Sequence, residues 1–205
     1  MKRQSGFTII EIIIVVIILG LLAATALPRF LNVTEQAEDA SIDGIAGGFA
    51  SAVGLVRGQW EVAARPSGNF DTGGGALSTN GTFVTVDGVQ VAVNAASGAG
   101  VVAGFPTGAP RADSRVSSMD HDQCRNVLNL IMQNAPTSVA QNAGGTVTVA
   151  NLAGASLFVQ VDTNQCYYYQ TNGLSAIPAA AATNLLNGFI YNPATGSVTV
   201  FKNKA

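Results

Sequence analysis

The N-terminal part of the chain is its most apolar segment. Across residues 7–28 most positions are Ile, Val, Leu or Ala, and the single ionisable residue is Glu11. A helix of this length covers roughly 30 Å, about the thickness of a bilayer core. Lys2 and Arg3 precede it, and basic residues remain on the cytoplasmic side. The pattern predicts a transmembrane helix over 7–28, with its N-terminus in the cytoplasm and the remaining chain outside.

Beyond Pro28 the apolar residues return at spacings of three or four, which is the period of one helix face. We therefore predict one helix from about Thr8 to Ala63, kinked rather than stopped by Pro28. Its second half, residues 29–64, is amphipathic. The apolar stripe of this half consists of Ile42, Ile45, Phe49, Ala52, Val56 and Trp60.

Small residues recur along the predicted helix at a spacing of four. Each glycine costs a helix about 1 kcal/mol relative to alanine, so one interpretation is a loosely packed helix. The other is that the small residues allow a neighbouring backbone to approach closely. Both interpretations remain open. The pairs with this spacing are Gly20 with Ala24, Gly44 with Gly48, and Gly54 with Gly58.

Residues 65–205 have a different pattern, in which short β-rich runs alternate with turn formers. Residues 66–81 and 94–115 are predicted loops, and Asp87-Gly88 is a hairpin signal. The predicted strands are 82–86, 89–93, 146–150, 156–161, 166–171, 188–191 and 197–201.

One short helix is predicted between these strands. Ser118 or Asp120 can cap it, and Pro136 ends it. Cys124, Val127, Leu128 and Ile131 share one of its faces. The expected fold class is α+β: a long kinked N-terminal helix whose apolar stripe packs on an antiparallel sheet domain.

The composition narrows the possible functions. Of the 205 residues, 48% are apolar and only 11% are charged, with a net charge of −2. Nucleic-acid binding requires clustered basic residues, and the basic residues here are scattered. Arg111, Arg115 and Arg125 are the only local group, so no nucleic-acid partner is expected.

The chain has two cysteines, Cys124 and Cys166. Outside the cytoplasm two such thiols are expected to form a disulfide, which would join the short helix to a strand. The alternatives are two free thiols or a metal pair. Only His121 is available to complete a zinc site with them, so no metal is expected.

No catalytic constellation is evident, and we expect neither an enzyme nor a cofactor. The sequence DHD at 120–122 is compatible with a metal site or an acid–base pair, but a solvated helix N-terminus is favoured. The glycines at 73–75 lack the lysine of a phosphate loop. Beyond His121 the serines have no histidine to activate them.

The N-terminus resembles that of the type IV pilin family. The resemblance implies that residues 1–6 form a leader peptide, which a prepilin peptidase removes by cutting between Gly6 and Phe7. It also implies N-methylation of Phe7, a role in subunit assembly for Glu11, and a helix kink at Pro28. The matching residues are Lys2, Arg3, Gly6, Phe7, Thr8, Glu11, the apolar run and Pro28.

Glu11 needs a compensating partner, because a carboxylate within a membrane costs on the order of 3 kcal/mol. Cleavage after Gly6 creates an ammonium at Phe7, and methylation keeps its charge. Our hypothesis is that Glu11 of one subunit pairs with the Phe7 amine of an adjacent subunit, since an unpaired buried charge is costly. The alternatives are local hydration of Glu11 or pairing within its own chain.

Three further segments resemble the mannose-sensitive haemagglutinin (MSHA) pilins within this family. They are "GFP" at 104–106, "CRNVLNLIMQNAP" at 124–136 and "FIYNPATGSVTVF" at 189–201. The resemblance implies a homo-oligomeric, helical surface filament used for attachment, with a surface or carbohydrate as a possible ligand. The alternatives are a minor pilin, a pseudopilin of a type II secretion machine, and a membrane-tethered binding module with its ligand site in loops 66–81 and 94–115.

The family resemblance also implies partners and a location. The partners are the prepilin peptidase, an inner-membrane platform and an assembly ATPase. Before assembly the chain would span the inner membrane once, with its N-terminus in the cytoplasm. After assembly it would lie in a pilus on the surface of a Gram-negative bacterium.

Overall fold

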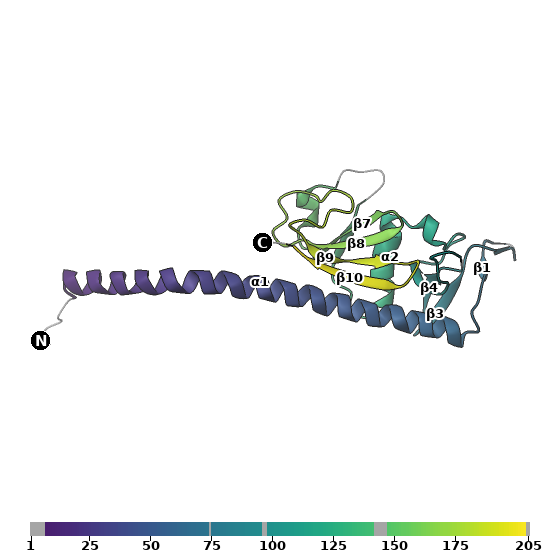
Figure 1. The fold of residues 1–205 in the computed structure, drawn as a ribbon, viewed down its shortest axis with the longest axis horizontal. Coiled ribbons are helices and arrows are strands. Elements are labelled where there is room, and N and C mark those ends of the chain that lie inside the picture. Colours follow the sequence, from purple (N-terminus) through teal and green to yellow (C-terminus); the bar gives the residue numbers. More distant parts are fainter. Residues whose placement is uncertain (1–6, 74, 96–97, 142–146, 204–205) are drawn as a thin grey trace, which may run out of the picture. The chain divides into compact units, whose positions relative to one another are not determined.

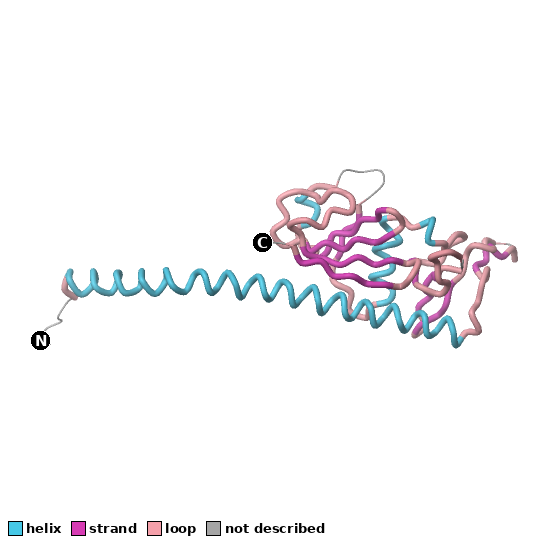
Figure 2. The backbone as a smooth tube through the Cα atoms, viewed as in Figure 1, coloured by secondary structure: helices cyan, strands magenta, loops and turns pink. Residues whose placement is uncertain are grey.

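The computed structural model describes residues 7–73, 75–95, 98–141 and 147–203. The chain divides into two compact units, one ending at Ser41 and one beginning at Ile42. Figure 1 gives the element order and Figure 2 the distribution of helix and strand. Helices and antiparallel strands make up an α+β fold, as the sequence predicts.

Helix α1 (Ile9–Val62) is a single α-helix of 54 residues, within one residue of the predicted limits at each end. It continues through Pro28, whose ring removes one backbone donor from the helical ladder. The kink at this residue remains a prediction.

Four of the five glycines in the second half of α1 face open space. A Cβ atom added to Gly44, Gly47, Gly54 or Gly58 would meet nothing within 4 Å. Only at Gly48 would it contact another side chain, Met132, at 3.6 Å. Packing within the described chain therefore does not require these glycines, and both interpretations of the small-residue pattern stay open.

The larger sheet has five strands in the order β10-β9-β8-β7-β6. All neighbouring strands pair antiparallel except β6 and β7, which pair parallel. The strands are β6 (Ser138–Ala140), β7 (Leu157–Asp162), β8 (Gln165–Gln170), β9 (Asn187–Asn192) and β10 (Ser197–Lys202).

The predicted strand 146–150 is wrong. Thr146 lies outside the described residues, Val147 and Thr148 are in neither helix nor strand, and the 3₁₀ helix η2 (Val149–Leu152) follows. Asn151 explains the difference, because its Oδ1 accepts the backbone N–H of Thr148 at 2.8 Å. Such local side-chain bonds compete with strand pairing. The edge of the sheet is instead formed by β6, which the sequence pattern did not reveal.

The smaller sheets involve segments that were expected to be loops. A three-stranded antiparallel sheet has the order β3-β4-β5, and the residues of its β3–β4 turn, Asp87 and Gly88, have φ of 49° and 80°, as a two-residue hairpin turn requires. A two-stranded ribbon forms within 66–81. The strands are β1 (Phe70–Asp71), β2 (Leu77–Ser78), β3 (Phe83–Val86), β4 (Val89–Val93) and β5 (Pro106–Gly108).

The apolar stripe of α1 is buried against both main sheets, rather than against one. Phe49 is fully buried and lies 5.2 to 5.4 Å, between ring centroids, from three rings of the five-stranded sheet. Val56 and Trp60 pack instead with valines of the three-stranded sheet. The residues that Phe49 meets are Tyr168, Phe189 and Tyr191, and those that Val56 and Trp60 meet are Val84, Val91 and Val93.

The predicted short helix is present as α2 (His121–Ile131), preceded by the 3₁₀ helix η1 (Val116–Ser118). Asp120 caps α2, since its Oδ1 accepts the N–H of Gln123 at 2.7 Å. Cys124 on this helix and Cys166 on β8 are fully buried and form a disulfide with a Cα–Cα distance of 5.4 Å. The bridge fixes α2 to the five-stranded sheet.

Two of the buried tyrosines, Tyr168 and Tyr191, should make the domain sensitive to alkali. The hydroxyl of Tyr168 donates to the carbonyl of Cys124 at 2.6 Å, and that of Tyr191 donates to the carbonyl of Pro106 at 2.9 Å. Burial raises the pKa of both phenols well above the ordinary value. Because these folded-state pKa values exceed the unfolded ones, the associated stability is complete below about pH 10 and is lost as pH rises further.

The measurement is a spectrophotometric titration of the four tyrosines, followed in parallel by near-ultraviolet circular dichroism. We expect Tyr168 and Tyr191 to ionise only together with the loss of the dichroism signal. A Tyr168→Phe variant should show one fewer late-ionising group. Ionisation of all four tyrosines near pH 10 with the dichroism intact would contradict the expected burial.

Candidate functional site

Glu11 is held at the first turn of α1 by a reciprocal set of hydrogen bonds with Thr8. The backbone N–H of Thr8 donates to Glu11 Oε2 at 3.2 Å, and its hydroxyl donates to the same oxygen at 3.1 Å. In return the backbone N–H of Glu11 donates to the Thr8 hydroxyl at 3.3 Å. This arrangement is a capping box, which satisfies backbone donors that have no partner at a helix start.

The capping box gives Glu11 a partner in its own chain, which was one of the alternatives to pairing between subunits. The two roles do not exclude each other, because a carboxylate can accept about four hydrogen bonds. The box also fixes the position of the carboxylate near the positive end of the helix dipole. The T-x-x-E spacing of Thr8 and Glu11 is the sequence signal for this contact, and the sequence analysis overlooked it.

The helical surface around Glu11 is apolar and exposed. All side chains from Phe7 to Leu31 are exposed, and Phe7 itself is 83% exposed. By length and composition α1 is apolar enough to cross a membrane. Exposed apolar area of this extent indicates a surface that lipid or other protein chains cover.

The predicted leader cleavage point lies only partly within the described residues. Gly6 is outside them, and Phe7 is the first described residue, two positions before α1 begins. Cleavage and N-methylation at this junction therefore remain predictions.

The DHD sequence at 120–122 has structural roles. Asp120 caps α2, as described above, and His121 Nδ1 accepts the backbone N–H of Val161 at 2.9 Å. Asp122 forms an ion pair with Arg125 at 3.0 Å. In the part of the chain that the structure describes, no group of three or more His, Cys, Asp or Glu side chains is arranged to hold a metal ion.

The three arginines considered for nucleic-acid binding each pair with an aspartate. The guanidinium of Arg115 also holds the pKa of Asp113 well below its usual range, chiefly through their hydrogen bond. Each aspartate offsets the charge of its arginine, so the group carries little net charge for attracting phosphates. The pairs and their distances are Arg111 with Asp120 at 3.1 Å, Arg115 with Asp113 at 2.8 Å, and Arg125 with Asp122 at 3.0 Å.

Comparisons with known proteins agree with the arrangement at the N-terminus. A family model described as the prokaryotic N-terminal methylation motif matches residues 1–27. The major component of a type IV narrow pilus of Thermus thermophilus is 38% identical over 78 residues, which are 35% of this chain and 67% of that protein. No solved structure gives a significant match.

Shorter matches include both fimbrial and secretion proteins. A fimbrial protein of Neisseria meningitidis is 41% identical over 73 residues, 34% of this chain and 40% of its own. A type II secretion system core protein G of Pseudomonas aeruginosa is 39% identical over 56 residues, 27% of this chain and 39% of its own. These relatives are named as filament or secretion components rather than as enzymes. With its methylation motif, its exposed apolar helix and its α+β domain, the chain belongs to the type IV pilin family.

Proposed function

We propose that this protein is a structural subunit of a type IV pilus of the MSHA type, which polymerises through its N-terminal helix into a surface filament for attachment. The observation that carries the proposal is the exposed apolar surface of residues 7–31, whose one carboxylate is fixed by the capping box at the helix start. In a filament the same surfaces of many copies would bury one another, and the carboxylate would meet a neighbour's N-terminal ammonium.

The proposed division of the chain follows from this role. Residues 1–6 are the leader and 7–28 are the membrane and filament-core segment. Residues 29–64 form the amphipathic half of the helix, and 65–205 form the domain on the filament exterior. Before assembly the subunit spans the inner membrane of a Gram-negative bacterium with its N-terminus in the cytoplasm.

The proposed partners process the subunit and move it out of the membrane. A prepilin peptidase removes the leader and methylates Phe7. Moving an apolar helix out of the bilayer is unfavourable until it is covered by other subunits, so an inner-membrane platform and an assembly ATPase provide the energy and the guidance.

Support for the MSHA type comes from contacts among the three segments that resemble MSHA pilins. The ring of Phe105 lies so close to Gly196 that a Cβ atom there would overlap it. The hydroxyl of Tyr191 donates to the carbonyl of Pro106 at 2.9 Å, and Cys124 at the start of the second segment anchors α2 to the sheet. Phe105, Leu128 and Tyr191, one from each segment, pack in the same hydrophobic cluster, so the three segments belong to one packed region.

The similarity to a type II secretion core protein supports a second candidate function, that of a pseudopilin in a secretion machine. Deletion of the gene separates the two. Loss of surface filaments in electron micrographs with normal secretion supports the pilus subunit, and a secretion defect with unchanged filaments supports the pseudopilin.

Mass spectrometry of the mature N-terminus tests leader cleavage and N-methylation, the first step of the proposed assembly. We expect a chain that begins at Phe7 and carries one methyl group on its amine. A Gly6→Leu variant should retain Met1, accumulate in the membrane and form no filaments. Filaments built from subunits that retain residues 1–6 would contradict the proposal, and an intact Met1 without filaments would favour a membrane-tethered binding module.

A further inference from the structure

The sequence contains three Asn-Gly pairs, and the fold places them in three different environments. They are Asn80-Gly81, Asn172-Gly173 and Asn187-Gly188. An Asn-Gly pair is prone to lose its side-chain amide, because glycine has no Cβ atom to hinder attack by its backbone nitrogen on the preceding side chain. The three dipeptides are identical, so differences in their reactivity come chiefly from the structure around them.

The pair Asn80-Gly81 is held on both sides of the backbone bond that must rotate for this attack. The carbonyl of Asn80 accepts the backbone N–H of Ser114 at 3.0 Å and the hydroxyl of the same residue at 3.1 Å. The N–H of Gly81 donates to the carbonyl of Ser78 at 3.3 Å. A Cβ atom on Gly81 would overlap the carbonyl of Arg111, so there is little room to rotate. The fold protects this pair.

The pair Asn187-Gly188 lies in β9, which has β8 and β10 as its neighbours. Gly188 is paired with Tyr169 on one side and with Phe201 on the other. The side chain of Asn187 is only 2% exposed. Rotation of the backbone here would disrupt pairing with the neighbouring strands, so reaction requires the sheet to open. Core strands are among the last parts of a domain to open, and this pair is protected as well.

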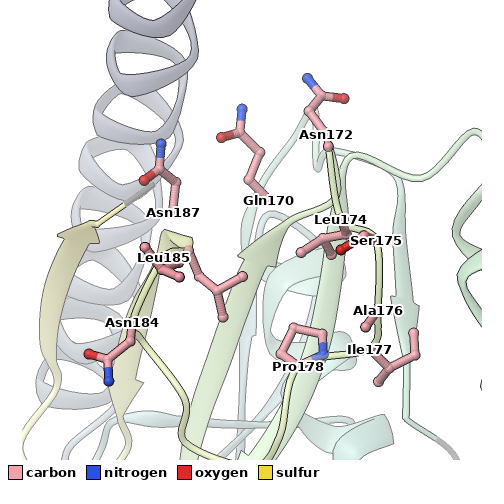
Figure 3. Close-up of a pocket in the computed structure, with 12 residues that line it drawn as sticks. Gln170, Asn172, Leu174, Ser175, Ala176, Ile177, Pro178, Asn184, Leu185 and Asn187 are labelled. Atoms are coloured by element: carbon pink, nitrogen blue, oxygen red, sulfur yellow. The ribbon is translucent and has the colours of Figure 1, made fainter. Parts of the chain in front are cut away.

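The pair Asn172-Gly173 lies at the start of the connection between β8 and β9, close to Gln170 and beside a hollow of about 410 Å³ (Figure 3). Asn172 and Gly173 are both exposed. The N–H of Leu174 donates to the carbonyl of Thr171 at 3.1 Å, which closes a tight turn with the pair at its centre. Gly173 has a φ of 72°, and its N–H donates to no acceptor within the described residues. The attacking nitrogen is therefore accessible in the folded chain.

We propose that Asn172 is a site of spontaneous deamidation. The backbone nitrogen of Gly173 loses its proton to hydroxide and attacks the side-chain carbonyl carbon of Asn172, which forms a five-membered cyclic imide. The carbon–nitrogen bond of the side-chain amide breaks, and the nitrogen takes up a proton from water and leaves as ammonia. Water then opens the imide at either of its two carbonyls and gives aspartate or isoaspartate. Water and hydroxide are the only co-reactants.

The reaction changes the chemistry of the surface at this turn. It adds one negative charge to a chain whose net charge is −2. The hollow beside the turn is lined by residues without an ionisable side chain, so the new carboxylate at position 172 introduces a charge there. Isoaspartate also lengthens the backbone by one methylene group just before Leu174, which packs on the cluster around Tyr169. We expect this product to loosen that contact.

The test uses the full chain in dodecylphosphocholine micelles, kept in mildly alkaline buffer and sampled over time. Chymotrypsin separates the three pairs, because it cleaves after the Leu, Phe and Tyr residues between them. Mass spectrometry of the peptides then measures the conversion at each pair, with a freshly prepared sample as the correction for reaction during digestion.

In the folded chain we expect Asn172 to convert about tenfold faster, or more, than Asn80 and Asn187, because only the latter two require local or global opening. The same chain in guanidinium chloride is the control. Without the fold, the three sites should react within about threefold of one another, since each has the same reacting dipeptide.

Two variants locate the charge change. Isoelectric focusing of the aged, unmodified chain should show an additional acidic band. Asn172→Gln keeps an amide at the turn but would have to close a six-membered imide, which forms more slowly, and it should lack this band. Asn80→Gln is the matched control and should retain the band. Labelling by an isoaspartyl methyltransferase should mark peptide 170–174 as the site of isoaspartate.

Three outcomes would overturn the proposal: Asn172 stays intact in the folded chain, Asn80 or Asn187 converts as fast as Asn172 there, or aged Asn172→Gln shows the same acidic band. All three pairs lie in the unit that begins at Ile42, and the measurements do not involve filaments. The result is therefore independent of the proposed function.

Discussion

Replacing Glu11 by alanine or valine is expected to abolish filaments while processed protein accumulates in the membrane. The carboxylate is the one ionisable side chain across residues 7–28, and without it the ammonium proposed at Phe7 of a neighbouring subunit would be buried unpaired. Leaving one partner of a buried ion pair alone costs about 3 to 5 kcal/mol. This cost would arise at every subunit contact of a filament, and it is large enough to prevent assembly.

The capping box makes a sharper version of this experiment possible. Glu11→Gln retains an oxygen that can accept the N–H of Thr8, and glutamine is a normal member of such boxes, but it removes the charge. Thr8→Val removes the hydroxyl and keeps the carboxylate, at a cost of about 1 kcal/mol to the helix start. We therefore expect no filaments from Glu11→Gln and filaments in somewhat reduced yield from Thr8→Val.

Sheared filament yield and immunoblots of membrane fractions measure both outcomes. Normal filaments from Glu11→Gln would eliminate the charge-pairing hypothesis. If Thr8→Val alone lost its filaments, the capping box rather than the charge would be the feature that assembly needs. A Thr34→Val variant is the control, because it removes a hydroxyl from the same helix whose hydrogen bond, to the carbonyl of Phe30 at 3.0 Å, is local.

Removal of the disulfide has the largest expected effect on stability. Cys124 and Cys166 are 42 positions apart, and closing a loop of this size is worth about 4 kcal/mol in the chain-entropy model. A double Cys124→Ser, Cys166→Ser variant should lose this amount in free energy of unfolding. For a chain of this length the melting temperature should fall by roughly 10 °C.

Thermal and guanidinium unfolding of the oxidised chain and the double variant measure the difference. Unmodified protein unfolded in the presence of a reductant should match the variant, which separates the loss of the bridge from the effect of two buried serine hydroxyls. A change below about 1 kcal/mol would show that packing of α2 through Val127 and Leu128, both fully buried, is sufficient to hold the helix on the sheet.

The sequence predicted the elements that depend on local patterns. The limits of α1, the capped helix α2 and the hairpin at Asp87-Gly88 follow from periodicity, caps and turn residues, which are properties of neighbouring positions. The T-x-x-E signal at Thr8 and Glu11 is equally local, so the capping box was readable although it was missed. The prediction of a strand over 146–150 failed because β propensity there competes with the local bond between Asn151 and Thr148.

Which segments become neighbours was decided only by the tertiary structure. The apolar stripe of α1 predicted burial, but not that Phe49 meets the five-stranded sheet while Val56 and Trp60 meet the three-stranded one. The parallel edge strand β6 and the hollow beside Gln170 likewise depend on residues far apart in sequence. Helical period and charge placement depend on neighbouring residues, so the sequence alone determined the extent of α1 and the position of Glu11 as the one acid of residues 7–28. Which strands pair with one another depends on contacts between segments that are far apart in sequence. These contacts can be identified only in the folded structure.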